Sequence, residues 1–337
     1  MTWGPRLIGE FEPCRLPAFG QPSLGELVNR LIEQQRETWP LLGDGYAAFE
    51  RTQTRRMEVA GTERSYVLVQ YNPGRIRSTA AAVDRASIES RACFLCPANL
   101  PPEERGLAYG SDLVITCNPF PVLDRHLSVM DRDHVPQRIE GRIASLLALS
   151  HDLGPDYFAL YNGPQCGASA PDHFHLQACA RSSLPIEEDL RRFDQRKSLR
   201  GGDHVGITLL DNCGRTVIVF RSADCAEMVG CVSLVVSGLR RETGRSEEPM
   251  ANIVAVFDSV TWTVFLFPRG RHRPESFFAE GDDKLVVSPG AIDMAGVIVT
   301  PRLEDFVRVT PVQIAKIFSE VSQSPPMVER ALDRCRC

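Results

Sequence analysis

The chain has 337 residues, a formal net charge of −5 at pH 7, 43% hydrophobic residues and 24% charged residues. This is the composition of a globular protein that can bury a large core, and its acidic balance argues against a broad nucleic-acid surface. No apolar run reaches the roughly 18 residues of a membrane span, and the N-terminus lacks a signal-peptide core. We therefore expect a cytoplasmic protein with neither nucleic acid nor membrane as a partner.

The predicted elements of the first part alternate between helices and short strands. An amphipathic helix is predicted over 23–37, with Ser23 as its cap. The elements that follow it, from hydrophobic periodicity, are strands at 65–71, 111–117 and 126–131, a helix at 137–151, and strands at 156–161 and 173–180.

A polar segment at 181–204 separates this part from the rest of the chain. The strand-like runs beyond it lie at 216–221, 231–237, 251–257, 261–267 and 296–300. A last helix is predicted after Thr310, with Pro311 at its first position and Gln313 closing a capping box. The two parts share a short, degenerate repeat, in which a strand is followed by a segment with arginine and histidine, so we expect a duplicated α+β unit.

The most informative stretch reads CGASAPDHFHLQACA, at residues 166–180. In a strand, His173, His175 and Gln177 share one face, and the residues between them face the core. Three aligned polar side chains on an apolar strand are costly to bury without partners, which indicates a site. The alternative is a solvated strand face with two incidental histidines.

Small residues precede these histidines. Gly167, Ala168 and Ser169 let the backbone come close to a ligand, and their amides and hydroxyl suit phosphate oxygens. A C-x-x-C pair, Cys93 and Cys96, is typical of half a zinc site or of a redox pair. Its loop is rich in proline, which favours a metal knuckle, and histidine is the expected source of the two missing ligands. Most of the other cysteines are expected to be buried reduced thiols.

Together these motifs resemble the nucleotidyltransferase branch of the histidine-triad superfamily, which contains galactose-1-phosphate uridylyltransferase, diadenosine tetraphosphate phosphorylase and GDP-L-galactose phosphorylase. The segments that carry the resemblance are NGPQCGASAPDHFHLQ, CFLC, NPFPVLDRHLSVMDRDH and AIDMAGVIVTP, between about residues 65 and 310. The resemblance implies an α+β fold built from a duplicated histidine-triad-like unit, with an antiparallel half-barrel sheet and flanking helices. Residues 1–200 would form the half with the zinc knuckle and catalytic strand, and 201–337 a second, degenerate half.

The resemblance also implies a structural Zn²⁺ site. Its ligands would be Cys93, Cys96, His134 and His173, two thiolates and two imidazoles around a tetrahedral ion. His126, which falls earlier in the same segment, is the alternative to His134.

By the same resemblance, His175 is the nucleophile that forms a covalent nucleotidyl-histidine intermediate. Gln177 would donate to the transferred phosphate, and Ser169 would contact a phosphate oxygen. Hydrolase branches of the superfamily have a third histidine where Gln177 stands, and glutamine cannot act as an acid. The sequence departs from the uridylyltransferases in one extra residue after Ser169 and in Asp172, which replaces a proline.

Further residues are implied at the substrate. Those expected at the nucleoside, ribose or phosphates are Asn118, Phe120, Asn162, Gly167, Arg75 and Arg77. Arg91, also near the knuckle, is a further phosphate candidate. In the second half, Arg269 and His272 are candidates for the acceptor's phosphate, and Asp293 for a substrate hydroxyl.

We therefore expect a nucleotidyltransferase or phosphorylase that acts on a nucleoside diphosphate sugar or a dinucleoside polyphosphate, with phosphate or a sugar phosphate as acceptor. The alternatives are a hydrolase of the same substrates and a non-catalytic, zinc-containing nucleotide-binding protein. The sequence selects neither base nor sugar, and it leaves both a monomer and a homodimer open.

Overall fold

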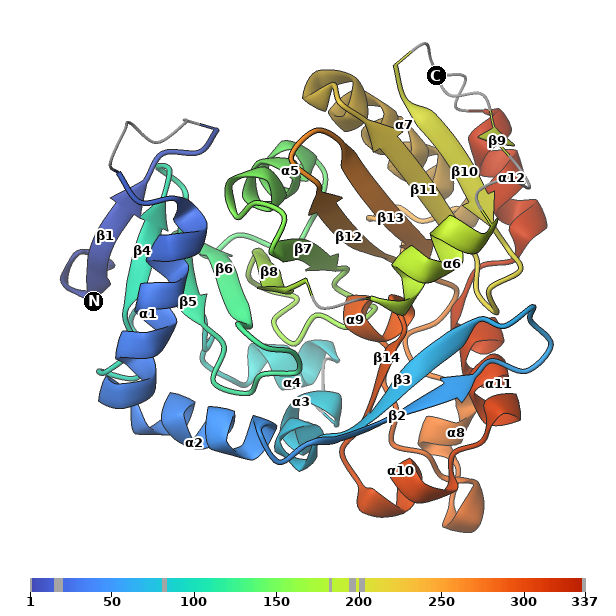
Figure 1. The fold of residues 1–337 in the computed structure, drawn as a ribbon, viewed down its shortest axis with the longest axis horizontal. Coiled ribbons are helices and arrows are strands. Elements are labelled where there is room, and N and C mark those ends of the chain that lie inside the picture. Colours follow the sequence, from blue (N-terminus) through green and yellow to red (C-terminus); the bar gives the residue numbers. More distant parts are fainter. Residues whose placement is uncertain are drawn as a thin grey trace.

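A long mixed sheet runs through the molecule (Figure 1). The computed structural model describes residues 2–14, 21–80, 84–181, 184–193, 198–199 and 204–334. Within this part of the chain, eleven strands pair in the order β1-β4-β5-β6-β8-β7-β12-β13-β11-β10-β9, antiparallel except for β1 with β4. These strands are β1 (Leu7–Phe11), β4 (Gly106–Tyr109), β5 (Leu113–Cys117), β6 (Leu127–Asp131), β7 (Tyr157–Asn162), β8 (His175–Ala180), β9 (Ser198–Leu199), β10 (Gly206–Leu210), β11 (Val217–Ser222), β12 (Ala251–Phe257) and β13 (Trp262–Pro268).

A second, three-stranded sheet contains β2 (Gln53–Glu58), β3 (Tyr66–Tyr71) and β14 (Val297–Thr300). Because β14 pairs in parallel with β3, this small sheet joins the N-terminal and C-terminal parts of the chain. It lies below the right-hand half of the long sheet in Figure 1.

Helices cover the long sheet. The described α-helices are α1 (Leu24–Thr38), α2 (Pro40–Phe49), α3 (Ile76–Thr79), α4 (Arg85–Glu89), α5 (Ile143–Asp152), α6 (Pro185–Phe193), α7 (Cys225–Thr243), α8 (Glu275–Phe278), α9 (Ala291–Met294), α10 (Leu303–Arg308), α11 (Pro311–Val321) and α12 (Pro325–Asp333). Helices α1, α2, α5, α7 and α12 share one hydrophobic core with the long sheet. None of the described helices has the length and apolar character needed to cross a membrane.

Side-chain alternation along β7 shows how the two faces of the long sheet are buried. Tyr157, Ala159 and Tyr161 belong to the core under the helices. Phe158 and Leu160 point the other way, into a core shared with the small sheet, α6, α9, α10 and α11. Neighbouring residues of a strand face opposite sides, so an apolar strand such as β7 needs a cover on both faces.

A third, smaller core lies under the C-x-x-C loop. It contains Cys93 and Leu95 from the loop, Val114 and Met130 from β5 and β6, and Ala170 from the segment before β8. The second face of the long sheet is therefore covered by two separate layers, the small sheet with its helices and the C-x-x-C loop. The candidate site lies where these two layers meet.

Most of the predicted elements are present, and two predicted helix caps are confirmed. Ser23 and Glu26 form a capping box at the start of α1, and Thr310 and Gln313 form one at the start of α11. These signals are local because a cap satisfies backbone N–H groups with side chains only three residues away.

Four predicted segments were wrong or partly wrong. The strand predicted at 231–237 lies inside α7, whose valines recur at helical spacing along its buried side. The helix predicted at 137–151 begins only at Ile143, after Gly141 with a φ of +74° that a right-handed helix cannot include. The polar segment 181–204 contains α6, and the strand predicted at 173–180 begins at His175.

The predicted fold class is confirmed as α+β, with a large open sheet, flanking helices and no closed barrel in the described part of the chain. The predicted boundary between residues 200 and 201 lies outside the described residues. The division into two duplicated halves stays a prediction.

Two helical glycines give a matched test of this packing. An added Cβ at Gly45 in α2 would overlap the carbonyl oxygen of Pro119, whereas one at Gly230 in α7 would meet nothing within 4 Å. We expect Gly45→Ala to lower the free energy of unfolding by about 1–3 kcal/mol through overpacking. Gly230→Ala should raise it by up to about 1 kcal/mol through helix propensity. Urea unfolding measures both, and a stabilising Gly45→Ala would contradict the packing of α2.

Candidate active site and metal cluster

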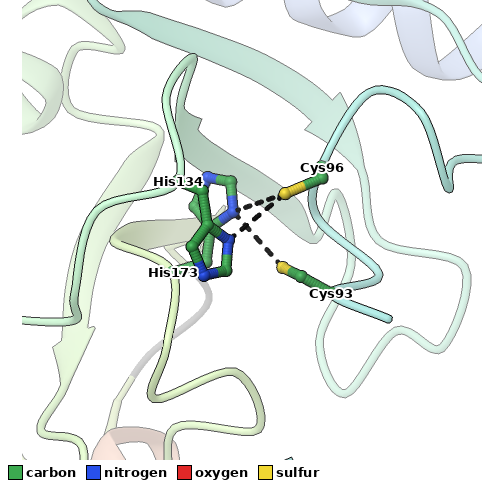
Figure 2. Close-up of side chains that lie close together, drawn as sticks. All are labelled: Cys93, Cys96, His134 and His173. Carbon is green, nitrogen blue, oxygen red and sulfur yellow. Dashed lines mark hydrogen bonds between the residues drawn. The ribbon is translucent and has the colours of Figure 1, made fainter. Parts of the chain in front are cut away.

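Four side chains expected from the sequence to bind metal lie together in the structure (Figure 2). The ligand atoms of Cys93, Cys96, His134 and His173 all lie within 4.8 Å of one another. The Nδ1 atom of His173 is 3.3 Å from the Cys93 sulfur and 3.6 Å from the Cys96 sulfur. The Cys96 sulfur is 3.2 Å from Nδ1 of His134. This Cys2His2 cluster joins the C-x-x-C loop to the segments that follow β6 and precede β8.

The donor set and spacing fit a tetrahedral metal ion. Zinc bonds of about 2.3 Å to sulfur and about 2.0–2.1 Å to nitrogen place neighbouring ligand atoms roughly 3.5 Å apart, close to the distances found here. The outer nitrogen of His173, Nε2, is 2.9 Å from the main-chain oxygen of Asp131, so it donates and leaves Nδ1 as the free lone pair. Such a hydrogen bond on the far side of the ring is the usual support of a metal-binding histidine.

Asp172, the departure from the uridylyltransferase pattern, supports this cluster. Its carboxylate forms a 2.6 Å ion pair with Arg91, which precedes the C-x-x-C loop, and lies 3.9 Å from Nε2 of His134. Arg91 also stacks over the ring of Phe94. The aspartate thus holds the C-x-x-C loop against the segment that leads into β8, through its ion pair with Arg91.

His126 lies outside the metal cluster and contacts Gln177. Its Nδ1 accepts a hydrogen bond from the main-chain N–H of Val122 at 3.2 Å, so Nε2 carries the proton. Nε2 is 2.8 Å from Oε1 of Gln177 and donates to it. Burial, together with the charge of Arg75, lowers the pKa of His126 to about 3, so the ring is neutral. With its oxygen held in this way, the Gln177 amide keeps N–H groups that have no partner in the described part of the chain.

The His175 ring is fixed in the same manner. Its Nδ1 donates to the main-chain oxygen of His173 at 2.9 Å, which leaves the lone pair on Nε2. The side-chain amide of Gln137 fixes the main chain of His175, because it accepts from the His175 N–H and donates to the His175 carbonyl oxygen. Burial lowers the pKa of His175 to about 4, and the ring is therefore neutral. Its exposed fraction is 6%, and it is not among the residues that line the cavities described below.

A polar cavity lies beside Gln177, and we call it the reaction cavity because Gln177 is expected from the sequence to contact the transferred phosphate. The residues of its wall that come from the first part of the chain include Arg75, His126, Asn162, Gly167, Ser169 and Gln177. Those from the second part include His272, Arg273, Ser288, Gly290 and Asp293. The two parts of the chain therefore meet at this cavity, as the small sheet and the long sheet do.

Glycine is required in one part of this wall. Gly167 has a φ of +112°, and a Cβ there would lie 2.9 Å from Cα of Gly290 and 3.0 Å from Oδ1 of Asn162. Asn162 in turn accepts hydrogen bonds from the main chain of Ala291 and the side chain of Asn252 through that oxygen. Asn162 and Gly167 thus hold the cavity wall together, whatever contact they make with a substrate.

A second, more apolar cavity of about 420 Å³ adjoins the first. We call it the nucleoside cavity because its lining contains Asn118 and Phe120, which are expected from the sequence at a nucleoside. Its apolar lining includes Trp39, Leu95, Leu100, Phe120 and Met130, and its polar lining includes Arg75, Glu104, Thr116, Asn118, Ser128 and Ser169. Arg75 and Ser169 line both cavities and mark their junction. The side-chain oxygen of Asn118 accepts from the N–H of Phe120 at 3.0 Å, which shapes the turn that carries both residues.

A row of polar side chains connects the two cavities across the sheet. Gln177 on β8 pairs with Ser128 on β6, which pairs with Thr116 on β5. Residues opposite each other on neighbouring strands share a face. The row therefore runs from the reaction cavity to the far part of the nucleoside cavity.

Two residues that the sequence suggested for substrate binding, Arg269 and Asp293, form hydrogen bonds within the protein. Arg269 is 1% exposed and donates to the main-chain oxygens of Pro289, His272 and Val321 among others, so it holds loops together. Both carboxylate oxygens of Asp293 accept main-chain N–H groups. The side chain of Arg77 lies outside the described residues.

Sequence reasoning missed other residues of the site. These are Glu104, Thr116, Gln137 and Arg273, which belong to no short motif and reach the site only through tertiary packing. His126 was noticed, but as a rival metal ligand. The signal that could have separated it from His134 is its position directly before β6, the strand that pairs with β8 and places Ser128 opposite Gln177.

Comparison with known proteins supports the fold. The chain matches the model of a family described as a domain of unknown function, DUF4922, over residues 31–180. No curated protein matches it in sequence.

Three solved structures illustrate the likeness. Yeast Ap4A phosphorylase Apa2 in complex with Ap4A aligns with a TM-score of 0.54 and 16% identity, over 85% of this chain and 97% of that chain. A second structure of the yeast enzyme has a TM-score of 0.52 and 14% identity, over 84% and 93%. An ADP-glucose phosphorylase from Arabidopsis thaliana aligns at a TM-score of 0.36 and 14% identity, over 81% and 99%. The chain therefore has the fold of the yeast Ap4A phosphorylase, in agreement with the superfamily branch that its motifs resemble.

Proposed function

We propose that the protein is a nucleotidyltransferase or phosphorylase that acts on a nucleoside diphosphate sugar or a dinucleoside polyphosphate. The observation that carries this proposal is the pair of fixed, neutral groups on β8. These are the His175 ring with its lone pair on Nε2 and the Gln177 amide, whose N–H groups have no partner among the described residues. The shared fold with a phosphorylase of Ap4A agrees with a nucleotide substrate.

In the proposed first step, Nε2 of His175 attacks the α-phosphorus of the donor. A neutral imidazole is nucleophilic without losing a proton, and the Nδ1–H bond to the His173 carbonyl stabilises the positive charge that the ring gains. The P–N bond forms as the bond to the leaving group breaks, which is a sugar phosphate for a nucleoside diphosphate sugar and a nucleotide for a dinucleoside polyphosphate. The ring is buried and lines neither cavity, and the proposed route of the α-phosphate to it starts at the junction of the two cavities, which Arg75 and Ser169 line.

Gln177 would stabilise the non-bridging oxygens of the transferred phosphate. It donates hydrogen bonds but cannot protonate a leaving group, and His126 holds it in the required orientation. In the second step an oxygen of phosphate or of a sugar phosphate attacks the same phosphorus and the P–N bond breaks. The proposed place for this acceptor is the side of the reaction cavity lined by His272, Arg273 and Ser288.

We assign zinc to the Cys2His2 cluster. Two thiolates and two imidazoles form a closed, structural site, which leaves no open position for a substrate. Its contribution would be to fold the C-x-x-C loop against the start of β8, and thereby to position His175 two residues beyond a ligand.

The metal assignment predicts a loss of both zinc and stability in one double variant. Metal analysis of the wild-type protein should give about one zinc per chain. Cys93→Ser with Cys96→Ser should abolish it and lower the free energy of unfolding by several kcal/mol, because a structural site contributes folding energy. His126→Gln and Cys14→Ser, outside the cluster, should retain the zinc. Full zinc content in the double variant would refute the ligand set.

The role of Gln177 predicts a dependence on the acceptor. Turnover of the donor should require phosphate or a sugar phosphate and should be slow in water alone. Gln177→His should raise hydrolysis relative to transfer, because a histidine can supply a proton to the reaction. Product analysis by chromatography, with and without acceptor, measures the ratio. Equal hydrolysis by the wild-type enzyme in the absence of any acceptor would instead support the hydrolase.

The nucleophile predicts a chemical rescue. His175→Gly removes the imidazole and leaves a small cavity, while the zinc content should stay unchanged. The variant should lose activity on the natural donor by several orders of magnitude, because the groups of such a site act as a unit. It should recover transfer from a nucleoside 5′-phosphorimidazolide, which brings its own imidazole.

Isotope labelling completes this test. With an α-³²P-labelled donor and no acceptor, the wild-type protein should retain label through an acid-labile, base-stable bond, and His175→Gly should retain none. A binding protein without turnover would hold nucleotide but show no covalent label. Substantial activity of His175→Gly on the natural donor would show that another residue attacks the phosphorus.

A further inference from the structure

The far part of the nucleoside cavity contains a buried acid that the proposed mechanism does not use. Glu104 is 6% exposed and lines the cavity just before β4. Its main chain is fixed, since its N–H donates to Pro101 and its carbonyl oxygen accepts from Arg6. Arg6 directs its other hydrogen bonds to the carbonyl oxygens of Leu100 and Pro101. Among the described residues, none forms an ion pair with the Glu104 carboxylate.

Thr116 supplies a second polar group at the same place. It is 1% exposed, lines the same cavity, and its hydroxyl has no hydrogen-bond partner within the described part of the chain. The hydroxyl lies near the Glu104 carboxylate and acts to lower the pKa of Glu104. Burial outweighs both this effect and the charge of Arg6, and it raises the pKa of Glu104 to about 7. A buried hydroxyl is costly when unsatisfied, so Thr116 indicates a ligand that supplies its partner, and the neighbouring Glu104 carboxylate can accept hydrogen bonds from the same ligand.

The rest of the cavity shows what kind of ligand fits. Its apolar walls, which include Trp39 and Phe120, suit the faces of an aromatic ring. Its other end, at Arg75 and Ser169, joins the reaction cavity. Thr116 lies two strands from Gln177 along the polar row, roughly 10 Å at about 4.8 Å per strand. A nucleotide with its phosphate at Gln177 would therefore present its base edge to Glu104 and Thr116.

We propose that Glu104 and Thr116 read the base of the substrate and select guanine. The inference rests on the proposed function and specifies its substrate class as a guanosine nucleotide. A carboxylate offers two acceptors side by side, and the Watson–Crick edge of guanine offers two adjacent donors, N1–H and N2–H. The Thr116 hydroxyl would then donate to a guanine acceptor such as O6.

The other bases match this pair of groups less well. Adenine places the acceptor N1 beside its N6 amino group, so one oxygen of the carboxylate would face a lone pair. Uracil offers a single N–H between two carbonyl oxygens, and both of these would be repelled by Glu104. A site whose buried polar groups are left unpaired rejects the wrong ligand strongly.

Equilibrium binding to the full-length, zinc-loaded protein tests the proposal without turnover. Calorimetric titration with GMP, AMP and UMP should give the tightest binding for GMP, by about tenfold or more. Glu104→Gln converts the pair of acceptors into one donor and one acceptor, which matches adenine. This variant should lose about tenfold or more in GMP affinity and bind AMP at least as tightly as GMP.

Two further variants serve as control and cross-check. Glu103→Gln removes the same charge from the exposed neighbouring residue and should leave all three affinities unchanged. Thr116→Val keeps the shape of the side chain and should weaken GMP more than UMP. Thermal unfolding of each variant verifies that it is folded.

The outcomes separate this inference from the proposed function. If wild-type protein binds AMP or UMP as tightly as GMP, or if Glu104→Gln keeps the guanine preference, the base assignment is wrong. In that case, label transfer to His175 from another nucleotide would still support the proposed function. If none of the three nucleotides binds and no donor labels His175, the proposed function itself fails.

Discussion

The site depends on one constraint, the alternation of side chains along β8. Leu176 and Ala178 are fully buried in the core under the helices, which forces His175 and Gln177 onto the opposite face. A shift of register by one residue would exchange the two sets and bury the catalytic candidates among leucines. The hydrophobic core therefore fixes the direction of the reactive groups, and the pairing of β8 with β6 and β7 fixes their position.

The second face of the long sheet explains why a cavity exists there at all. One end of this face is covered by the small sheet and its helices, and the other by the C-x-x-C loop. The polar row of Gln177, Ser128 and Thr116 lies between the two covers and is the part of the face that an apolar layer could not bury without cost. The metal cluster matters in this setting because it anchors one of the two covers to the start of β8.

Main-chain hydrogen bonds set the state of each reactive group. The carbonyl of His173 fixes the His175 tautomer, the N–H of Val122 fixes that of His126, and His126 in turn orients Gln177. These groups are buried, and burial keeps both rings neutral. In the proposed reaction, a neutral His175 beside a neutral Gln177 would suit transfer between anionic phosphates, because neither group would need to gain or lose a proton first.

The sequence by itself determined the features that are local. The C-x-x-C pair, the spacing of His175 and Gln177, and the capping boxes depend on residues a few positions apart, and each could be predicted. The α+β class also followed from the pattern of elements. Only the tertiary structure distinguished His126 from His134, because the two histidines lie in the same segment of the sequence. In the folded chain His126 contacts Gln177, whereas His134 lies in the Cys2His2 cluster. No sequence motif pointed to Glu104 as a site residue. Its burial near the Thr116 hydroxyl arises from parts of the chain that meet only in the folded protein.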